Sequence, residues 1–330
     1  MLMMKQLVCL FFFLLLILSC REVSPIRELK KGDSVSDFAD TLFLGKVENL
    51  YAYKNKLYFI EQFRNQIVVL DDNLRLTGLV GIEGEGPTNL CGISGFVIHD
   101  DTLCAIDPVC GKILLFSMDG RVVGRRQFVG NEPLMPEFRF VASKGNLIEM
   151  SVSDKQGAFG RLDILSDSIS FWGQRTLYPF DDLERIRNGR HLFKYKSHYI
   201  CISDNEPVIE FYDAVRKRKG CLDYTSLDVV QRRLNYLRSH SSSSAANSYG
   251  IICEDAYVDE NDNLLILLLS SNGDKGYEVN TLAVFDLQHD GARLREVCKL
   301  SGSVYSSFCY MDGSVYAFNV EQSVLEQFFL

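Results

Sequence analysis

The stretch NKLYFIEQFRNQIVVLDDNLRL, residues 55–76, returns 46 positions later without a gap as DTLCAIDPVCGKILLFSMDGRV, residues 101–122. Each copy contains an apolar run, an acidic residue, a turn and a second apolar run. Short runs rich in β-branched and aromatic residues, bounded by Asp, Asn or Gly, are typical of β-hairpins. A period of roughly 40 to 50 residues made of such hairpins indicates a β-propeller in which every copy belongs to one blade.

The same pattern occurs four more times, with middle turns of different length. The further copies are residues 145–173, 197–224, 261–291 and 313–330. None of them shows a helical period. The sequence therefore predicts an all-β fold, a six-bladed β-propeller that extends over residues 33–330 as one domain.

The last copy ends with the chain, which leaves its blade one strand short. An incomplete blade would expose the unpaired hydrogen-bonding groups of an edge strand. The segment DFADTLFLGKV, residues 37–47, precedes the first copy and has no partner there. We therefore expect this N-terminal segment to complete the last blade, so that residues near Leu42 lie beside those near Phe328.

One segment between the fourth and fifth copies departs from the strand pattern. TSLDVVQRRLNYLRSH, residues 225–240, follows Tyr224 with apolar residues at near-helical spacing and Ser226 as a candidate cap. The serine-rich segment 241–248 that follows reads as a loop. We predict a short helical insertion near 226–238 that covers or rims the propeller.

The N-terminus has the features of an export signal. It contains Lys5, an apolar run from Leu7 to Leu18, and then Ser19 and Cys20. A run of about a dozen apolar residues is too short to span a bilayer, which takes roughly 20, but it fits a secretory signal. The ending ILSC resembles a bacterial lipobox, in which cleavage exposes the cysteine for acylation.

This ending predicts a signal peptide over residues 1–19, lipidation of Cys20, and a flexible tether over residues 20–32. The alternative is an uncleaved N-terminal anchor with an incidental cysteine. A lipid anchor would place the protein on the outer membrane of the cell envelope. The residues after Cys20, REVSP, lack an acidic run, which favours the periplasmic side over the cell surface.

Composition excludes some functions. The net charge is -8 and no basic stripe is present, so nucleic-acid binding, which depends on neutralising phosphates, is not expected. Eight cysteines lie beyond Cys20 and none forms a C-x-x-C pair, which argues against a zinc site. An exported location permits disulfides, but several cysteines lie in apolar runs, so we expect mostly free buried thiols.

A glycine-rich turn lies between the first two copies. It contains Gly84, Gly86 and Pro87 and follows a strand that ends at Val80 and Gly81. The arrangement resembles the first crossing between blades in the six-bladed β-propeller lipoproteins of Bacteroidetes, relatives of the NHL-type propellers. Thr88-Asn89 replaces the Gly-Glu of that family's signature. The resemblance implies the propeller fold and mainly a binding role.

Physically, the glycines permit positive φ where the chain leaves an outer strand, and Pro87 fixes one dihedral angle. A phosphate-binding loop is the alternative, but neither Lys-Ser/Thr nor a helix follows. We therefore predict a structural turn at Gly84, Gly86 and Pro87.

No catalytic or metal-binding motif emerges, and no cofactor is predicted. The five histidines, His99, His191, His198, His240 and His289, are scattered through the chain, without the i, i+4 spacing of a helical zinc motif. No G-x-S-x-G nucleophile elbow is present.

Two carboxylates occupy the same repeat position. Glu61 and Asp107 both end the first apolar run of their copy. They either cap hairpins or belong to a ring of carboxylates around the mouth of the axial channel. Phe63, Arg64 and Arg139 could also line a rim.

The leading functional hypothesis is a membrane-anchored binding module for an envelope protein or a small-molecule ligand, because variable loops converge on each face of a propeller. A hydrolase or lyase that acts on a carbohydrate or lactone is the first alternative, since related propellers include such activities. A structural subunit of an envelope complex is the second. The fold alone does not choose among the three.

Overall fold

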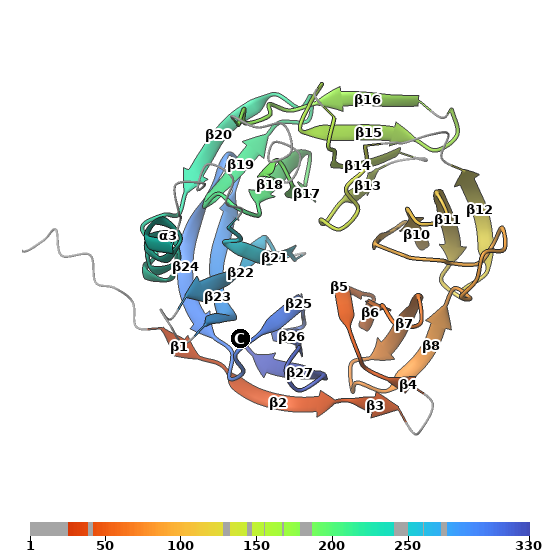
Figure 1. Ribbon diagram of the computed structural model, residues 1–330, viewed down its shortest axis with the longest axis horizontal. Helices are drawn as coiled ribbons and strands as arrows, with labels where there is room; N and C mark the ends of the chain where they lie inside the picture. The colour runs from red at the N-terminus through yellow and green to blue at the C-terminus, as the bar shows by residue number, and fades with distance from the viewer. Residues whose placement is uncertain are drawn as a thin grey trace, which may run out of the picture.

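The computed structural model of the protein describes residues 26–38, 42–127, 133–143, 147–154, 156–166, 168–178, 187–240, 250–259, 261–271 and 276–330. The predicted signal peptide and Cys20 lie outside these residues. The described chain forms six small antiparallel sheets arranged as a ring around a central axis (Figure 1). The predicted six-bladed β-propeller is therefore confirmed.

The blades follow one another in chain order, each with its first strand nearest the axis. Blade 1 contains β5 (Val47–Tyr53), β6 (Lys56–Glu61), β7 (Gln66–Asp71) and β8 (Leu76–Val80). Blade 2 contains β9 (Gly95–His99), β10 (Thr102–Asp107), β11 (Lys112–Ser117) and β12 (Val122–Gln127). Blade 3 contains β13 (Val141–Ser143), β14 (Leu147–Ser151), β15 (Phe159–Asp163) and β16 (Ser168–Trp172).

The second half of the ring is built in the same way. Blade 4 contains β17 (Arg190–Tyr195), β18 (His198–Ser203), β19 (Val208–Tyr212) and β20 (Arg218–Asp223). Blade 5 contains β21 (Cys253–Val258), β22 (Asn263–Ser271), β23 (Tyr277–Gln288) and β24 (Gly291–Lys299). Blade 6 contains β25 (Tyr305–Met311), β26 (Ser314–Asn319) and β27 (Val324–Phe329). In every blade the repeat found in the sequence begins at the second strand, so the first strands lie outside it.

The N-terminal segment closes the ring. β1 (Arg27–Glu28) runs parallel to β24 of blade 5, and β2 (Lys30–Val35) then pairs antiparallel with β27 as the outer strand of blade 6, with Lys31 opposite Phe328. Closure by an N-terminal strand is confirmed, but the predicted segment is wrong. The described residues of the range 37–47 do not pair with β27. Instead, β3 (Asp37–Phe38) and β4 (Leu42–Phe43) form a separate short hairpin.

The physical reason for this difference is solvent exposure. The β2 sequence KKGDSV has no apolar face, because an outer strand packs on one neighbour and faces water elsewhere. Lys31 Nζ lies 2.5 Å from a carboxylate oxygen of Glu326, which is buried, and Arg27 lies 2.8 Å from Glu296. The strands β1 and β2 also occupy residues 27–32, which the sequence assigned to the tether.

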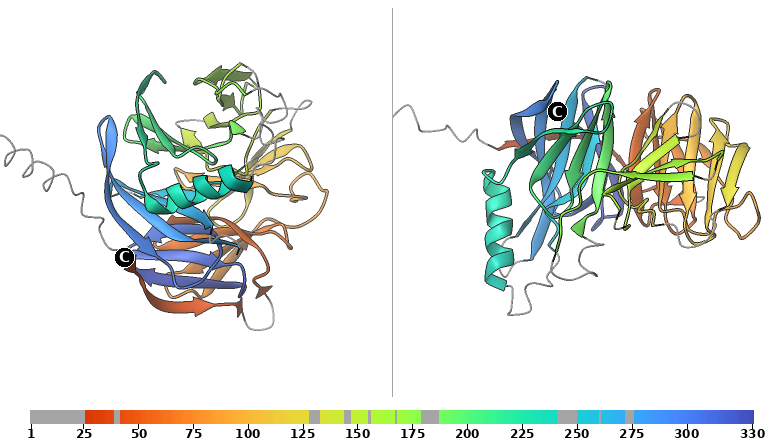
Figure 2. Two further views of the ribbon diagram at one scale, coloured as in Figure 1. Left: turned by 60° about the vertical axis from the view of Figure 1, so that its left-hand side comes forward. Right: turned by 90° about the horizontal axis from the view of Figure 1, so that it is seen from above.

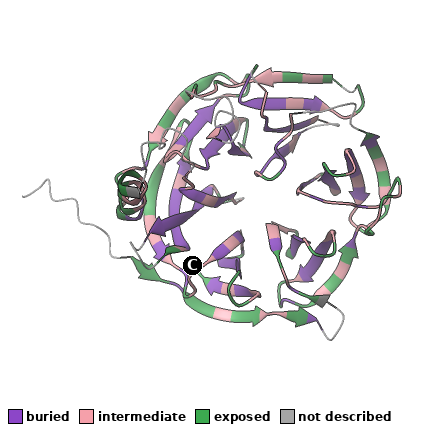
Figure 3. Ribbon diagram, viewed as in Figure 1, coloured by how far each residue is buried: buried purple, intermediate pink, exposed green. Residues whose placement is uncertain are grey.

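Burial is greatest in the second strands and falls toward the outer strands (Figure 3). All nine residues of β22 are buried, whereas the outer strand β24 exposes most of its side chains at least in part. The apolar faces of neighbouring blades pack on one another, as in the cluster that joins Leu57 of blade 1 to Phe318 of blade 6. The apolar core thus consists of layers between neighbouring blades. Residues outside these layers lie around the axis.

The predicted helical insertion is confirmed. Helix α3 (Asp228–His240) lies between β20 and β21 and runs along the perimeter of the propeller (Figure 2). Val229 and Val230 bury its inner side in the apolar cluster that contains Ile252 and Leu268. Within the described part of the chain, no helix has the length and apolar character needed to cross a membrane.

Candidate functional site

The two faces of the propeller carry different connections. The crossing face carries the turns between second and third strands and the segments that lead from one blade to the next. The opposite face carries the turns between first and second strands, and we call it the vestibule face. Glu61 and Asp107 end β6 and β10 on the crossing face, in equivalent positions of blades 1 and 2.

Glu61 is a turn cap. Its carboxylate is 1% exposed and accepts hydrogen bonds from the backbone amides of Gly45 and Lys46, both at 3.3 Å, and of Arg64 at 3.0 Å. These donors belong to the turn after β6 and to the segment that enters the same blade. The carboxylate therefore ties a hairpin to the incoming chain and is not open to a ligand.

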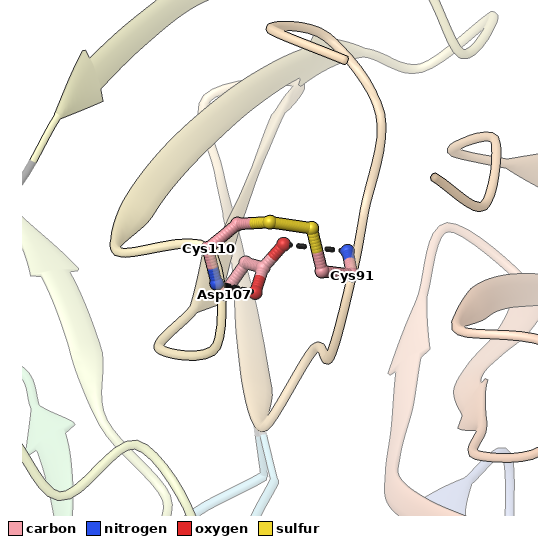
Figure 4. Close-up of side chains that lie close together, drawn as sticks. All are labelled: Cys91, Asp107 and Cys110. Atoms are coloured by element: carbon pink, nitrogen blue, oxygen red, sulfur yellow. Dashed lines mark hydrogen bonds between the residues drawn. A yellow bond between two sulfur atoms is a disulfide. The ribbon is translucent and has the colours of Figure 1, made fainter. Parts of the chain in front are cut away.

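Asp107 does the same in blade 2 (Figure 4). It is fully buried and accepts hydrogen bonds from the backbone amides of Cys91 at 2.7 Å and Cys110 at 3.0 Å. Cys91 and Cys110 are joined by a disulfide, so the same two segments are linked twice. The other described cysteines are free, and five of the six are buried, which agrees with the expectation of mostly free thiols.

The glycine-rich turn lies against this disulfide. Gly81 and Gly84 have φ values of +89° and +140°, which side-chain-bearing residues rarely adopt. The carbonyl of Gly86 accepts a hydrogen bond from Lys112 Nζ at 2.9 Å, and a Cβ at Gly84 or Gly86 would lie 2.9 Å from the Asn89 side chain. The turn is thus filled by its own chain, as a structural turn would be.

The three residues that could line a rim lie in different parts of the molecule. Phe63 and Arg64 are exposed on the crossing face, where the Phe63 ring covers Gly45. Arg139, in contrast, is 6% exposed and does not line a rim. It lies on the axis, in the segment that leads into β13.

Arg139 connects most of the ring. Its guanidinium binds the Asp255 carboxylate in a bidentate pair, with Nε–Oδ1 at 2.9 Å and Nη2–Oδ2 at 2.6 Å. The remaining guanidinium hydrogens reach oxygen atoms of blades 1 and 6: Asn49 Oδ1, Leu50 O, Ser307 Oγ and Phe308 O. Its backbone amide donates to His191 Nδ1 of blade 4 at 3.2 Å. Side chains from four blades thereby meet at one residue, which seals the middle of the channel.

Three titratable groups in this part of the molecule have shifted pKa values. Burial lowers the pKa of His191 to about 4, so its ring is neutral at physiological pH. Toward the crossing face, burial and the charges of Asp255 and Glu48 raise the pKa of Glu254 to about 7. Burial and the charge of Glu254 raise the pKa of Asp204 to about 8. At neutral pH, Asp204 is therefore mostly protonated and Glu254 about half protonated.

The vestibule face is hollow at the axis. Two adjoining cavities of about 360 and 310 Å³ share Tyr51, Tyr257 and Val258 as lining residues. Together we call them the vestibule. Their aromatic lining comes mainly from first strands of the blades: Tyr51, Tyr53, Phe96, Tyr257 and Tyr310. Tyr51 stands edge-on to both Phe96 and Tyr257, each at 6.2 Å between ring centroids.

Charge is distributed unevenly around the vestibule. The cavity next to blades 2 to 4 is lined by the cationic side chains of Lys194, Lys196 and the buried Arg139, and by no carboxylate. Lys196 Nζ is 2.9 Å from Asp262, whereas Lys194 is exposed and has no ion pair with any residue in the described ranges. The cavity next to blades 5 and 6 contains Asp259 and Asp312.

The sequence pointed to this site only through Arg139, which it offered as a rim residue. The vestibule uses the first strands, which lie outside the repeat, and Arg139, which belongs to a segment of irregular structure. Among the described lining residues, no serine or cysteine nucleophile lies beside a base. The apolar runs and the aromatic residues of the first strands are the sequence signals that could have suggested the vestibule.

Comparison with known proteins supports the fold. No protein-family model matches the chain, and no curated protein matches it. A protein of Bacteroides fragilis NCTC 9343 described as exported is 13% identical, with a TM-score of 0.60 over 91% of this chain and 86% of that one. A member of the DUF4221 family from Bacteroides vulgatus is 10% identical, with a TM-score of 0.59 over 92% and 97%.

A third solved structure is an enzyme. Catalytically inactive virginiamycin B lyase from Staphylococcus aureus, solved with quinupristin, is 11% identical, with a TM-score of 0.52 over 87% of this chain and 81% of that one. At these identities the likeness shows the propeller fold and nothing finer.

Proposed function

We propose that this protein is a ligand-binding propeller of the cell envelope and that the vestibule is its binding site. The observation that carries the proposal is a hollow of aromatic rings and cations above an axis sealed by Arg139. Its two parts have the volume of small-molecule sites, which begin at roughly 300 Å³, and such sites combine apolar walls with a few polar groups.

The charge of the lining indicates the class of ligand. Lys194 is an exposed cation without an ion pair in the described ranges, and no carboxylate lines its side of the vestibule. Tyrosine rings offer flat apolar faces together with hydroxyl groups. The ligand we propose is a sugar-sized molecule that carries a carboxylate.

The location we propose is the periplasmic side of the outer membrane, with lipid on Cys20. Support comes from the lipobox-like ending of the apolar run and from the structural likeness to a Bacteroides protein described as exported. Cys20 is six residues before Ile26, which allows a reach of roughly 20 Å. Since β1 lies at the perimeter (Figure 1), such a tether would leave the vestibule face accessible.

The alternative is a hydrolase or lyase that acts on a carbohydrate or lactone. It is favoured by the likeness to virginiamycin B lyase. Against it, Asp255 is fully engaged by Arg139, and His191 is buried with its pKa at about 4. A purely structural role in an envelope complex would not require a vestibule.

Three sugars that differ in charge test the proposal: glucuronate, glucose and glucosamine. We expect ligand-observed NMR with the full chain to show binding in the order glucuronate, glucose, glucosamine. Lys194→Gln should weaken glucuronate binding several-fold, whereas the matched change Lys30→Gln on the outer strand β2 should not. Turnover of a probe would favour the enzyme. Equal binding of all three sugars, or none, would refute the anionic class.

A further inference from the structure

A cluster of metal-ligating side chains lies outside the vestibule, where blade 4 meets blade 5. His198 is the first residue of β18, and His289 and Asp290 form the turn between β23 and β24. Ligand atoms of the three side chains all lie within 4.8 Å of one another. The two imidazole rings meet edge to face, with centroids 4.5 Å apart.

The chemistry of this set is that of a transition-metal site. Imidazole nitrogen and carboxylate oxygen are ligands of Zn²⁺, and three protein ligands with a water molecule complete a tetrahedral shell. In such a shell, neighbouring ligand atoms lie about 3.4 Å apart, given metal–ligand distances near 2.1 Å. His289 and Asp290 are mostly exposed, so side-chain rotation can bring the three ligands to this separation without moving the strands.

A neighbouring group already orients one of the ligands. Ser197 Oγ lies 3.3 Å from Nδ1 of His198, which leaves Nε2 of that ring for a metal. Asp290 Oδ1 lies 3.1 Å from Nδ1 of His289, a contact between two of the proposed ligands that the ion would replace. Groups that hold the second ring nitrogen are a regular feature of metal-binding histidines.

We propose that His198, His289 and Asp290 bind a divalent transition-metal ion of the Zn²⁺ class. The ion would join blade 4 to blade 5 on the vestibule face. Because its ligands come from two blades, the ion binds the folded ring more tightly than the unfolded chain, so binding stabilises the fold by an amount that rises with the logarithm of the ion concentration above Kd. Two imidazole rings in ordinary edge-to-face surface contact are the competing interpretation.

Calorimetric titration of the full chain with ZnCl₂ decides between them. We expect one ion per chain, a higher Tm with added Zn²⁺, and at least tenfold weaker binding for His198→Gln and for His289→Gln, the scale on which metal sites respond to altered ligation. Co²⁺ should give the visible absorption of a tetrahedral site.

The chain supplies matched controls. His99 also lies beside an aspartate, with Nε2 at 3.2 Å from Asp100, but belongs to no three-residue cluster among the described residues. His99→Gln should therefore leave Zn²⁺ affinity unchanged, as should Cys221→Ser, which removes the exposed free thiol. No binding, or equal binding by the His198→Gln/His289→Gln double variant, would overturn the proposal.

Discussion

The two faces of the propeller use their side chains in different ways. On the crossing face, Glu61 and Asp107 occupy one repeat position and direct their oxygens at backbone amides. On the vestibule face, Tyr51 and Tyr257 come from the first strands, and their rings border an open hollow. Residues that the sequence repeats therefore hold the blades together, whereas the residues around the proposed site vary from blade to blade.

The largest expected effect concerns Arg139, which separates the two faces. Arg139→Met leaves the buried Asp255 carboxylate without its partner, and loss of one member of a buried pair costs about 3–5 kcal/mol. Urea unfolding measures the change. Arg125→Met, on the outer strand β12, is the matched control because Arg125 is exposed. A loss no greater than that of the control would show that the axis is not held by this pair.

The disulfide on the crossing face gives the next effect. Its cysteines are 19 residues apart, and closing a loop of that size constrains the unfolded chain by about 3 kcal/mol. The double change Cys91→Ser/Cys110→Ser should lower the free energy of unfolding by about that amount and leave sugar binding at the vestibule intact. Cys221→Ser should change neither. Loss of binding in the double variant would mean that the two faces are coupled.

The smallest effect is a dependence of stability on pH that originates on the crossing face. The pKa of Asp204 is about 8 in the folded protein, against an ordinary value of 3.8. Between these values the unfolded chain releases a proton that the folded chain keeps, so stability is full below about pH 4 and falls as pH rises toward 8. Glu254, with a pKa of about 7, adds to this fall.

Asp204→Asn should remove part of this loss of stability at high pH. Between pH 5 and pH 8 the variant should gain more than about 1.4 kcal/mol relative to the wild type, which corresponds to a tenfold difference in proton affinity. Unfolding by urea at both pH values measures it, with Glu321→Gln on the surface as the control. An identical pH profile for Asp204→Asn and the wild type would contradict the assignment.

The contrast between the faces also explains what the sequence could reveal. The number of blades followed from apolar runs that recur, since the repeat has a structural cause in every blade. The closing strand was misplaced because KKGDSV of β2 has no apolar face, while residues 37–47 do have apolar residues. A strand that faces solvent on the perimeter leaves little periodic signal.

The sequence could not predict the two sites, for a different reason. Arg139 precedes the short strand β13 in a stretch with no repeat partner, and its importance comes from atoms of blades 1, 5 and 6. His198 and His289 looked scattered because neighbouring blades bring them together only in the folded ring. Spacing along a chain reports contacts within a helix or a hairpin, but not contacts between blades.

The pairing of β2 with β27 sets the order in which the protein can mature. Lys31 is synthesised early, 297 residues before its partner Phe328. Until then the first strands of the chain have no edge to join, and contacts of such long range form slowly. The chain must therefore remain soluble with an open ring until β27 has been made, which makes this period the time when the propeller is most exposed to aggregation and proteolysis.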